Sequence, residues 1–136
     1  MSTPDSHGGR ELELLLNGTK PLAAFSYYIG ANEVDCFSGQ DFAGAVEDGQ
    51  LLRYEKSMQL DEKPVLFVAF TTPSESWRAH AYFHLIEFMY TQSWCAHLEW
   101  IEGSLLGHTD SQNRAHIMRK YGKDGPVSSC KHGLVR

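Results

Sequence analysis

Two histidines and a glutamate interrupt an otherwise apolar run, HAYFHLIEF, over residues 80–88. His84 follows His80 by four positions and Glu87 follows by three more, so on a helix the three side chains share one face. Two histidines one turn apart can bind the same metal ion, and a nearby carboxylate can serve as a third ligand or a general base. The spacing therefore permits a metal-binding or acid/base site at His80, His84 and Glu87.

A second interpretation of the same residues needs no chemistry. The pattern lacks the internal glutamate of the HExxH metalloprotease motif, and a helix that is apolar on most sides must still present its polar residues to water. We therefore expect His80, His84 and Glu87 to form a solvent-facing stripe, and the catalytic or metal site is the alternative. A divalent metal is compatible with the three side chains but is not expected, and the sequence does not identify any cofactor.

The helix that would position these residues has a clear start signal. Thr72 and Glu75 have the spacing of a capping box, and Pro73 occupies the first helical position. This predicts a helix over residues 73–91. The segment 76–83 also alternates between polar and apolar residues, as a strand would, but the start signal favours the helix.

Upstream of this helix, the sequence predicts a small sheet and short helices. Residues 50–60 alternate between apolar and polar side chains, which is typical of a half-buried strand, whereas residues 65–70 are continuously apolar and predict the central strand. The other expected elements are a helix within 11–18, a strand over 21–29, a turn or short strand within 30–37, and a helix over 41–48 capped near Ser38 and Asp41.

Two further helices are predicted downstream, over residues 94–106 with Ser93 as cap and over 110–121 behind a Thr109–Gln112 capping box. In the first, Leu98, Ile101 and Leu105 recur at helical spacing and predict a buried stripe. The whole pattern is an α+β fold: a small antiparallel sheet of three to four strands with helices packed on it, the last three helices consecutive. We expect a flexible leader over 1–9, a single α+β domain over 10–122 and a flexible basic tail over 123–136.

Composition narrows the classes of partner and compartment. The 136 residues carry a net charge of −5, divided between an acidic stretch to residue 113, with 6 Lys/Arg against 16 Asp/Glu, and a basic remainder, with 6 against 1. An acidic body argues against nucleic-acid binding.

No apolar run reaches the ~20 residues of a membrane span, and the N-terminus has no signal-peptide pattern. Three dispersed cysteines without a CxxC pair are typical of reduced thiols, so a soluble cytoplasmic protein without membrane contact is expected.

The function is predicted from the catalytic motifs that the sequence lacks and from the side chains that it could present to a partner. It contains no GxSxG elbow, P-loop or GxGxxG motif, whereas Trp77, Tyr90, Trp100 and His108 are candidate ligand or interface residues because such side chains suit pockets and interfaces. Trp100 lies off the predicted buried stripe and is available to a second subunit. We predict a non-enzymatic binding or interaction module, acting as a homo-oligomer (a homodimer) or as an acidic partner of another protein. The alternative is an enzyme or small-ligand protein with a pocket lined by His80, His84 and Glu87.

Overall fold

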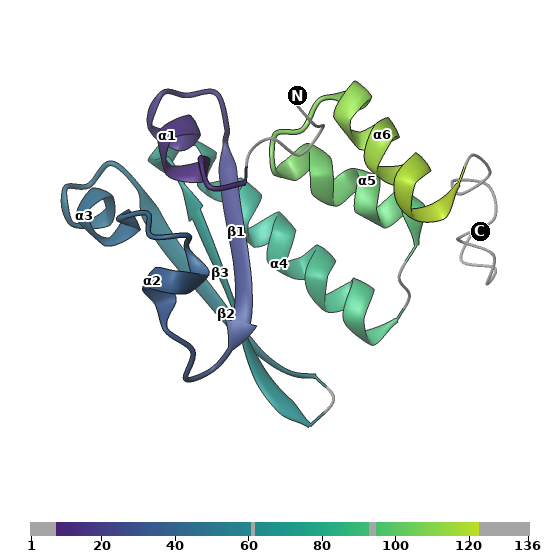
Figure 1. Ribbon diagram of the computed structural model, residues 1–136, viewed down its shortest axis with the longest axis horizontal. Helices are drawn as coiled ribbons and strands as arrows, with labels where there is room; N and C mark the ends of the chain where they lie inside the picture. The colour runs from purple at the N-terminus through teal and green to yellow at the C-terminus, as the bar shows by residue number, and fades with distance from the viewer. Residues whose placement is uncertain (1–7, 61, 93–94, 123–136) are drawn as a thin grey trace. The chain divides into compact units, whose positions relative to one another are not determined.

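The computed structural model describes residues 8–60, 62–92 and 95–122 (Figure 1). Within this part of the chain, the elements follow in the order α1, β1, α2, α3, β2, β3, α4, α5, α6. The described residues form two compact units, residues 8–80 (the N-terminal unit) and residues 81–122 (the C-terminal unit). Residues 1–7 of the predicted leader and the whole predicted tail lie outside the described residues. The single domain over 10–122 stays a prediction.

The N-terminal unit is built on an antiparallel sheet of three strands in the order β1-β3-β2. Both the α+β class and the antiparallel sheet are confirmed, and the continuously apolar segment is the central strand, as predicted. A fourth strand within 30–37 is not formed, because that segment contains a short helix instead. The strand bounds are β1 Leu22–Tyr28, β2 Leu52–Leu60 and β3 Lys63–Thr71.

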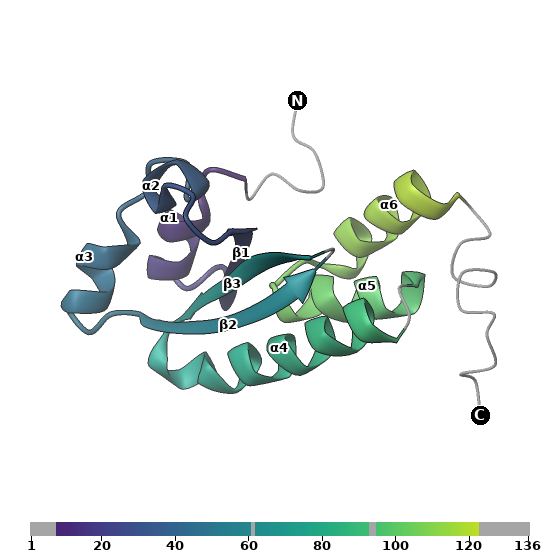
Figure 2. The same cartoon turned by 90° about the horizontal axis from the view of Figure 1, so that it is seen from below.

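Three short helices lie on one face of this sheet (Figure 2). Each begins or ends where the sequence supplies a suitable residue: the Asn32 side chain accepts from the Val34 N–H at the start of α2, and Asp41 accepts from the Gly44 N–H at the start of α3. The cap of α3 is thus Asp41, and the expected contribution of Ser38 is not seen. The helix bounds are α1 Glu11–Leu16, α2 Glu33–Cys36 and α3 Phe42–Glu47.

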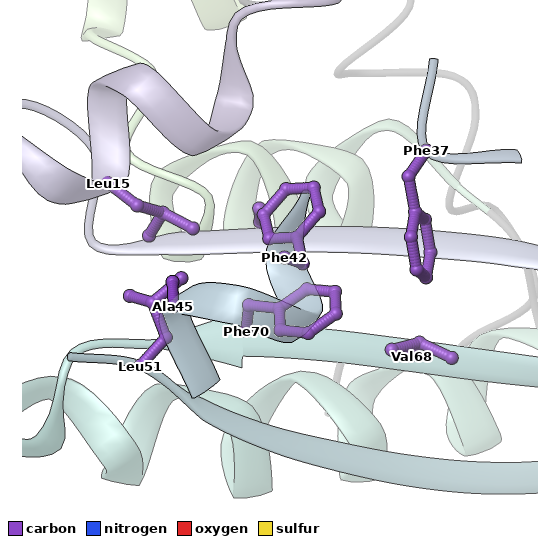
Figure 3. Packing of buried hydrophobic residues seen from close by; sticks show 8 residues of the cluster. Leu15, Phe37, Phe42, Ala45, Leu51, Val68 and Phe70 are labelled. Carbon is purple, nitrogen blue, oxygen red and sulfur yellow. The ribbon is translucent and has the colours of Figure 1, made fainter. Parts of the chain in front are cut away.

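Aromatic side chains fill the space between these helices and the sheet (Figure 3). Phe42 from α3 stacks on Phe70 from β3, with 4.2 Å between ring centroids and 14° between ring planes. Phe37, which follows α2, meets Phe70 edge to face at 5.5 Å. Since fully burying one such ring contributes about 1.5–3 kcal/mol, these contacts hold helices that are too short to be stable alone.

A polar cluster connects α2 to the sheet beside this core. Arg53 on β2 donates to both oxygens of Glu33, and its Nε donates to Glu55 at 2.7 Å. The Tyr27 hydroxyl on β1 also donates to Glu33. The side chains of Tyr27, Glu33 and Arg53 are partly buried and satisfy one another, which explains why a helix of four residues remains attached at the edge of the aromatic core.

The three consecutive final helices are confirmed, with one change at the first of them. The chain enters α4 through a 3₁₀ turn, Pro73–Glu75, and Thr72 makes no side-chain capping bond, so the capping box predicted there is wrong. Residues 76–83 are helical, which settles whether this segment is helix or strand.

At α6 the predicted capping box is confirmed, because Gln112 N–H donates to Thr109 Oγ1 at 3.1 Å and Thr109 N–H donates to Gln112 Oε1 at 2.7 Å. The helix bounds are α4 Ser76–Thr91, α5 Ala96–Leu105 and α6 Asp110–Tyr121.

Two sequence expectations concern the start of α5. Ser93, the predicted cap, lies outside the described residues. Cys95, the residue that precedes α5, is disulfide-bonded, so the expectation of reduced thiols is wrong there, whereas Cys36 is a free thiol. Within residues 8–60, 62–92 and 95–122, no helix has both the length and the apolar character needed to cross a bilayer.

Candidate functional site

The three residues predicted as a metal or acid/base site lie on α4, and each of them is exposed. The His80 ring lies against the Tyr54 ring of the N-terminal unit, with 5.1 Å between centroids, whereas His84 and Glu87 belong to the C-terminal unit. Among the described residues, these three included, no group of three or more His, Cys, Asp or Glu side chains is placed to hold a metal ion. The catalytic and metal roles of His80, His84 and Glu87 stay predictions.

The four residues predicted to line a ligand site or interface are divided between the two units. Trp77 is exposed in the N-terminal unit, where the Arg78 guanidinium lies 4.7 Å from the centre of its ring. Tyr90, Trp100 and His108 belong to the C-terminal unit. Tyr90 is exposed near the end of α4, and His108 is half-buried in the turn after α5. Trp100 differs from the others because it borders a hollow in the surface.

This hollow lies on the exposed side of α5 and measures about 270 Å³. Its walls are almost wholly apolar. Ile101 on its rim is 48% exposed, so its predicted place in the buried stripe of this helix is wrong. Trp100 is half-buried rather than fully exposed, and the Arg114 guanidinium from α6 lies 5.7 Å from its ring centre. Among the described residues, those that line the hollow are Ala96, His97, Trp100 and Ile101.

The exposed residues of α5 form a continuous stripe, because positions three and four apart on a helix lie on the same side. The stripe consists of the exposed His97, Ile101 and Ser104 together with the half-buried Trp100, and we call it the α5 stripe. Its two central members are large and apolar, and its two end members are polar. Large apolar side chains that remain exposed next to a hollow are typical of interaction surfaces.

On another side, α5 packs against α6, and a glycine permits their close approach. The two helices lie side by side (Figure 1), and a Cβ atom added at Gly103 would be 2.0 Å from Asn113 Oδ1. Asn113 is buried, and its Nδ2 donates to Ser104 Oγ at 3.1 Å. The side chain of Asn113 is therefore held in place, and residue 103 must lack a side chain.

Replacing Gly103 by alanine is expected to lower the free energy of unfolding of the C-terminal unit by about 1–3 kcal/mol, the usual cost of overpacking. The added methyl group would push Asn113 away and break its bond to Ser104. Urea denaturation measures the effect. The double variant Gly103→Ala/Asn113→Ala, compared with Asn113→Ala alone, should show a much smaller loss. An equal loss in both backgrounds would mean that the clash is not with Asn113.

The contact between α5 and α6 also encloses a buried carboxylate, Glu99, whose side chain is 3% exposed. Three groups of α6 bond to it: His116 Nε2 lies 2.8 Å from Glu99 Oε1, Lys120 Nζ lies 2.7 Å from Glu99 Oε2, and the Tyr121 hydroxyl donates to Glu99 Oε2. Because all three donors come from the second half of α6, one carboxylate fixes that half of the helix against α5.

A second carboxylate, Glu102, lies three residues further along α5. Burial raises the pKa of the Glu102 carboxyl, and the negative charge of Glu99 raises it further. Tyr82 on α4 donates to Glu102 Oε2 at 3.4 Å. Burial, followed by the charge of Glu102, also raises the pKa of the Tyr82 hydroxyl. Glu102 is thus suited to holding a proton, but it is not among the residues that line the hollow.

Replacing Glu102 by glutamine is expected to reduce the pH dependence of stability above the ordinary glutamate range. A carboxyl with a raised pKa binds its proton more tightly in the folded state, so stability falls as pH rises from the unfolded pKa through the folded one. Below that window both variants carry a neutral side chain there. Denaturation over a pH series checks this, with Glu87→Gln, an exposed carboxylate on α4, as control. Equal slopes for the wild type and Glu102→Gln would contradict it.

The cluster around Glu99 and Glu102 was not found from the sequence. The sequence predicted a buried apolar stripe on α5, and the glutamates between the members of that stripe were given no role. A signal was present, because Glu99 and Glu102 are spaced i, i+3 while His116 and Lys120 are spaced i, i+4 on the next helix, as facing helix surfaces of opposite charge would be. Comparison with known proteins finds no matching family model, no matching curated protein and no matching solved structure.

Proposed function

We propose that this chain is a non-enzymatic binding module that recognises another protein through the α5 stripe. The observation that carries the proposal is the exposed Ile101 on the rim of an apolar hollow, next to Trp100. Aromatic side chains and arginine are enriched where proteins bind each other. Trp100 with the Arg114 guanidinium over its ring supplies both.

The dimensions of the hollow favour a protein side chain over a small molecule. Small-molecule pockets usually enclose roughly 300–1,000 Å³ and bury most of the ligand, whereas this hollow measures about 270 Å³ and the described residues that line it all belong to α5. A stripe whose members lie three and four positions apart, with its large apolar residues at the centre, matches the way that one helix packs against another. The partner proposed here therefore inserts an apolar side chain from a helix.

Site-specific cross-linking in cells that produce the protein tests this function. A photo-activatable amino acid placed at position 101 should form protein adducts on illumination. The same amino acid at position 16 is the control, because Leu16 is 45% exposed, close to the 48% of Ile101, and belongs to α1 of the N-terminal unit. Adducts at position 101 should also decrease when Trp100 is replaced by alanine. Absence of adducts at position 101, or equal yields at both positions, would refute the proposed function.

A further inference from the structure

We infer that the partner at the α5 stripe is a second copy of this chain, whose α5 packs antiparallel against the first. The inference rests on the proposed function and specifies its partner. It follows from three properties of the stripe: its symmetry, its shape and its charge. A two-fold dimer uses the same surface on both subunits, so that surface must be complementary to itself.

The order of polar and apolar members in the α5 stripe is the same in both directions. An antiparallel pairing centred between Trp100 and Ile101 places Trp100 of each copy opposite Ile101 of the other. The same pairing places His97 opposite Ser104. Apolar residues then meet at the centre and polar residues meet at both ends, which is the usual distribution of a protein interface. A stripe with its apolar residues at one end would instead fit a different partner.

The shape of the stripe is also complementary to itself. Ile101 is 48% exposed, and the hollow lies beside it on the same side of α5. Each copy therefore offers a protruding side chain and a recess within one helical turn. In the antiparallel arrangement, Ile101 of each copy enters the recess next to Trp100 of the other, and the two insertions are equivalent by symmetry. This is the knob-and-hole relation of packed helices.

The charges near the stripe allow two copies to approach. The stripe contains no carboxylate, lysine or arginine, and the two glutamates of α5 lie elsewhere on the helix, Glu99 being 3% exposed. Like charges opposite each other would oppose self-association; none of the four stripe residues is charged, and among the described residues the charge beside the centre is the Arg114 guanidinium, which lies over the Trp100 ring of its own copy. Antiparallel packing also brings the positive N-terminal end of one α5 near the negative C-terminal end of the other.

The area of the interface predicts a weak association. The ten residues of α5 extend over about 15 Å, which is short for an interface that buries the usual ~800 Å² on each partner. We therefore expect a dimer that dissociates on dilution. Its concentration dependence is what the experiment measures.

The experiment combines mass measurement with isotope-coded cross-linking of the full-length chain. Light scattering across a concentration series should show a mass that rises from 15.3 kDa towards twice that value. Ile101→Glu should weaken association at least about 100-fold, because each copy loses an apolar anchor and places a charge against the apolar recess next to Trp100 of the other copy. The matched control Leu16→Glu should associate like the wild type. Circular dichroism should show that both variants remain folded, since both positions are exposed.

Cross-linking then identifies what occupies the stripe. When ¹⁵N-labelled and unlabelled chains that carry the photo-activatable residue at position 101 are mixed, mixed-isotope adducts are expected. A constant mass of 15.3 kDa up to about 1 mM, or a dimer that Ile101→Glu leaves intact, would overturn the inference. Adducts confined to single chains and ending within residues 123–136 would also overturn it, because the chain's own C-terminal segment would then cover the stripe. Adducts to other proteins alone, for example basic ones, would overturn it but leave the proposed function standing.

Discussion

Replacing Phe42 by alanine should lower the free energy of unfolding of the N-terminal unit by about 3–5 kcal/mol, the usual cost of removing a buried aromatic ring. Phe42 is 1% exposed, and its ring stacks on Phe70, which is fully buried. The alanine variant loses the burial of the ring and leaves a cavity that a short helix and a strand cannot close without losing their other contacts. Since Phe42 is the first residue of α3, that helix should detach first.

Hydrogen exchange read at the amides of β3 measures this loss within the N-terminal unit. Phe42→Leu should cost less, because leucine refills part of the cavity. Val34→Ala, at an apolar position of α2 that is exposed, should leave the exchange rates nearly unchanged. A loss for Phe42→Ala no greater than that for Val34→Ala would show that the stacked rings contribute little.

Replacing Glu99 by alanine is the second large effect, an expected loss of about 3 kcal/mol in the C-terminal unit. Each hydrogen bond to a charged group contributes roughly 1.5–3 kcal/mol, and Glu99 accepts bonds from three groups of α6. Part of this loss of stability is offset, because the alanine variant no longer buries a carboxylate. In addition, the side chains of His116 and Lys120, which are 43% and 45% exposed, can bind water instead.

A set of variants separates the charge of Glu99 from its packing. Glu99→Gln keeps the shape and should lose less stability than alanine, whereas Glu99→Leu fills the space without any acceptor and tests whether an apolar residue can replace the cluster. Lys120→Ala is the control on the α6 side and should cost less than Glu99→Ala, because two donors to Glu99 remain. Urea denaturation gives the four values. If Glu99→Ala is as stable as the wild type, the buried carboxylate does not hold α6.

The fold could be predicted where local signals and tertiary contacts agree. The alternating residues of β2, the continuously apolar β3 and the capping box at Thr109 each identified their element. α2 was missed because its four residues are fewer than the periodic pattern of a helix requires. At α4 the polar stripe was predicted correctly, since His80, His84 and Glu87 are all exposed, but Trp77 and Tyr90 are exposed as well.

The candidate site could be predicted only in part, because a helix does not encode which of its sides meets a partner. On α5 the apolar spacing placed Ile101 in the interior, whereas the structure exposes Ile101 and buries Glu99. That reversal depends on α6, which supplies the donors for the carboxylate and approaches closely at Gly103. Trp100 was predicted from the sequence as a residue available to a partner, and that role stays a proposal. The hollow beside it arises from side-chain packing and has no signature in residue spacing.

The order of the strands has a consequence for how the N-terminal unit folds. β2 and β3 form a hairpin whose nearest partners, Leu60 and Lys63, are three positions apart, whereas β1 joins β3 through partners as distant as Leu22 and Thr71, 49 positions apart. Hairpins form in about 1–10 μs, and distant pairings must first overcome the entropy of closing a longer loop. We expect the β2–β3 hairpin to form early and the docking of β1 to limit the folding rate. Substitutions in β1 should then slow folding more than they accelerate unfolding.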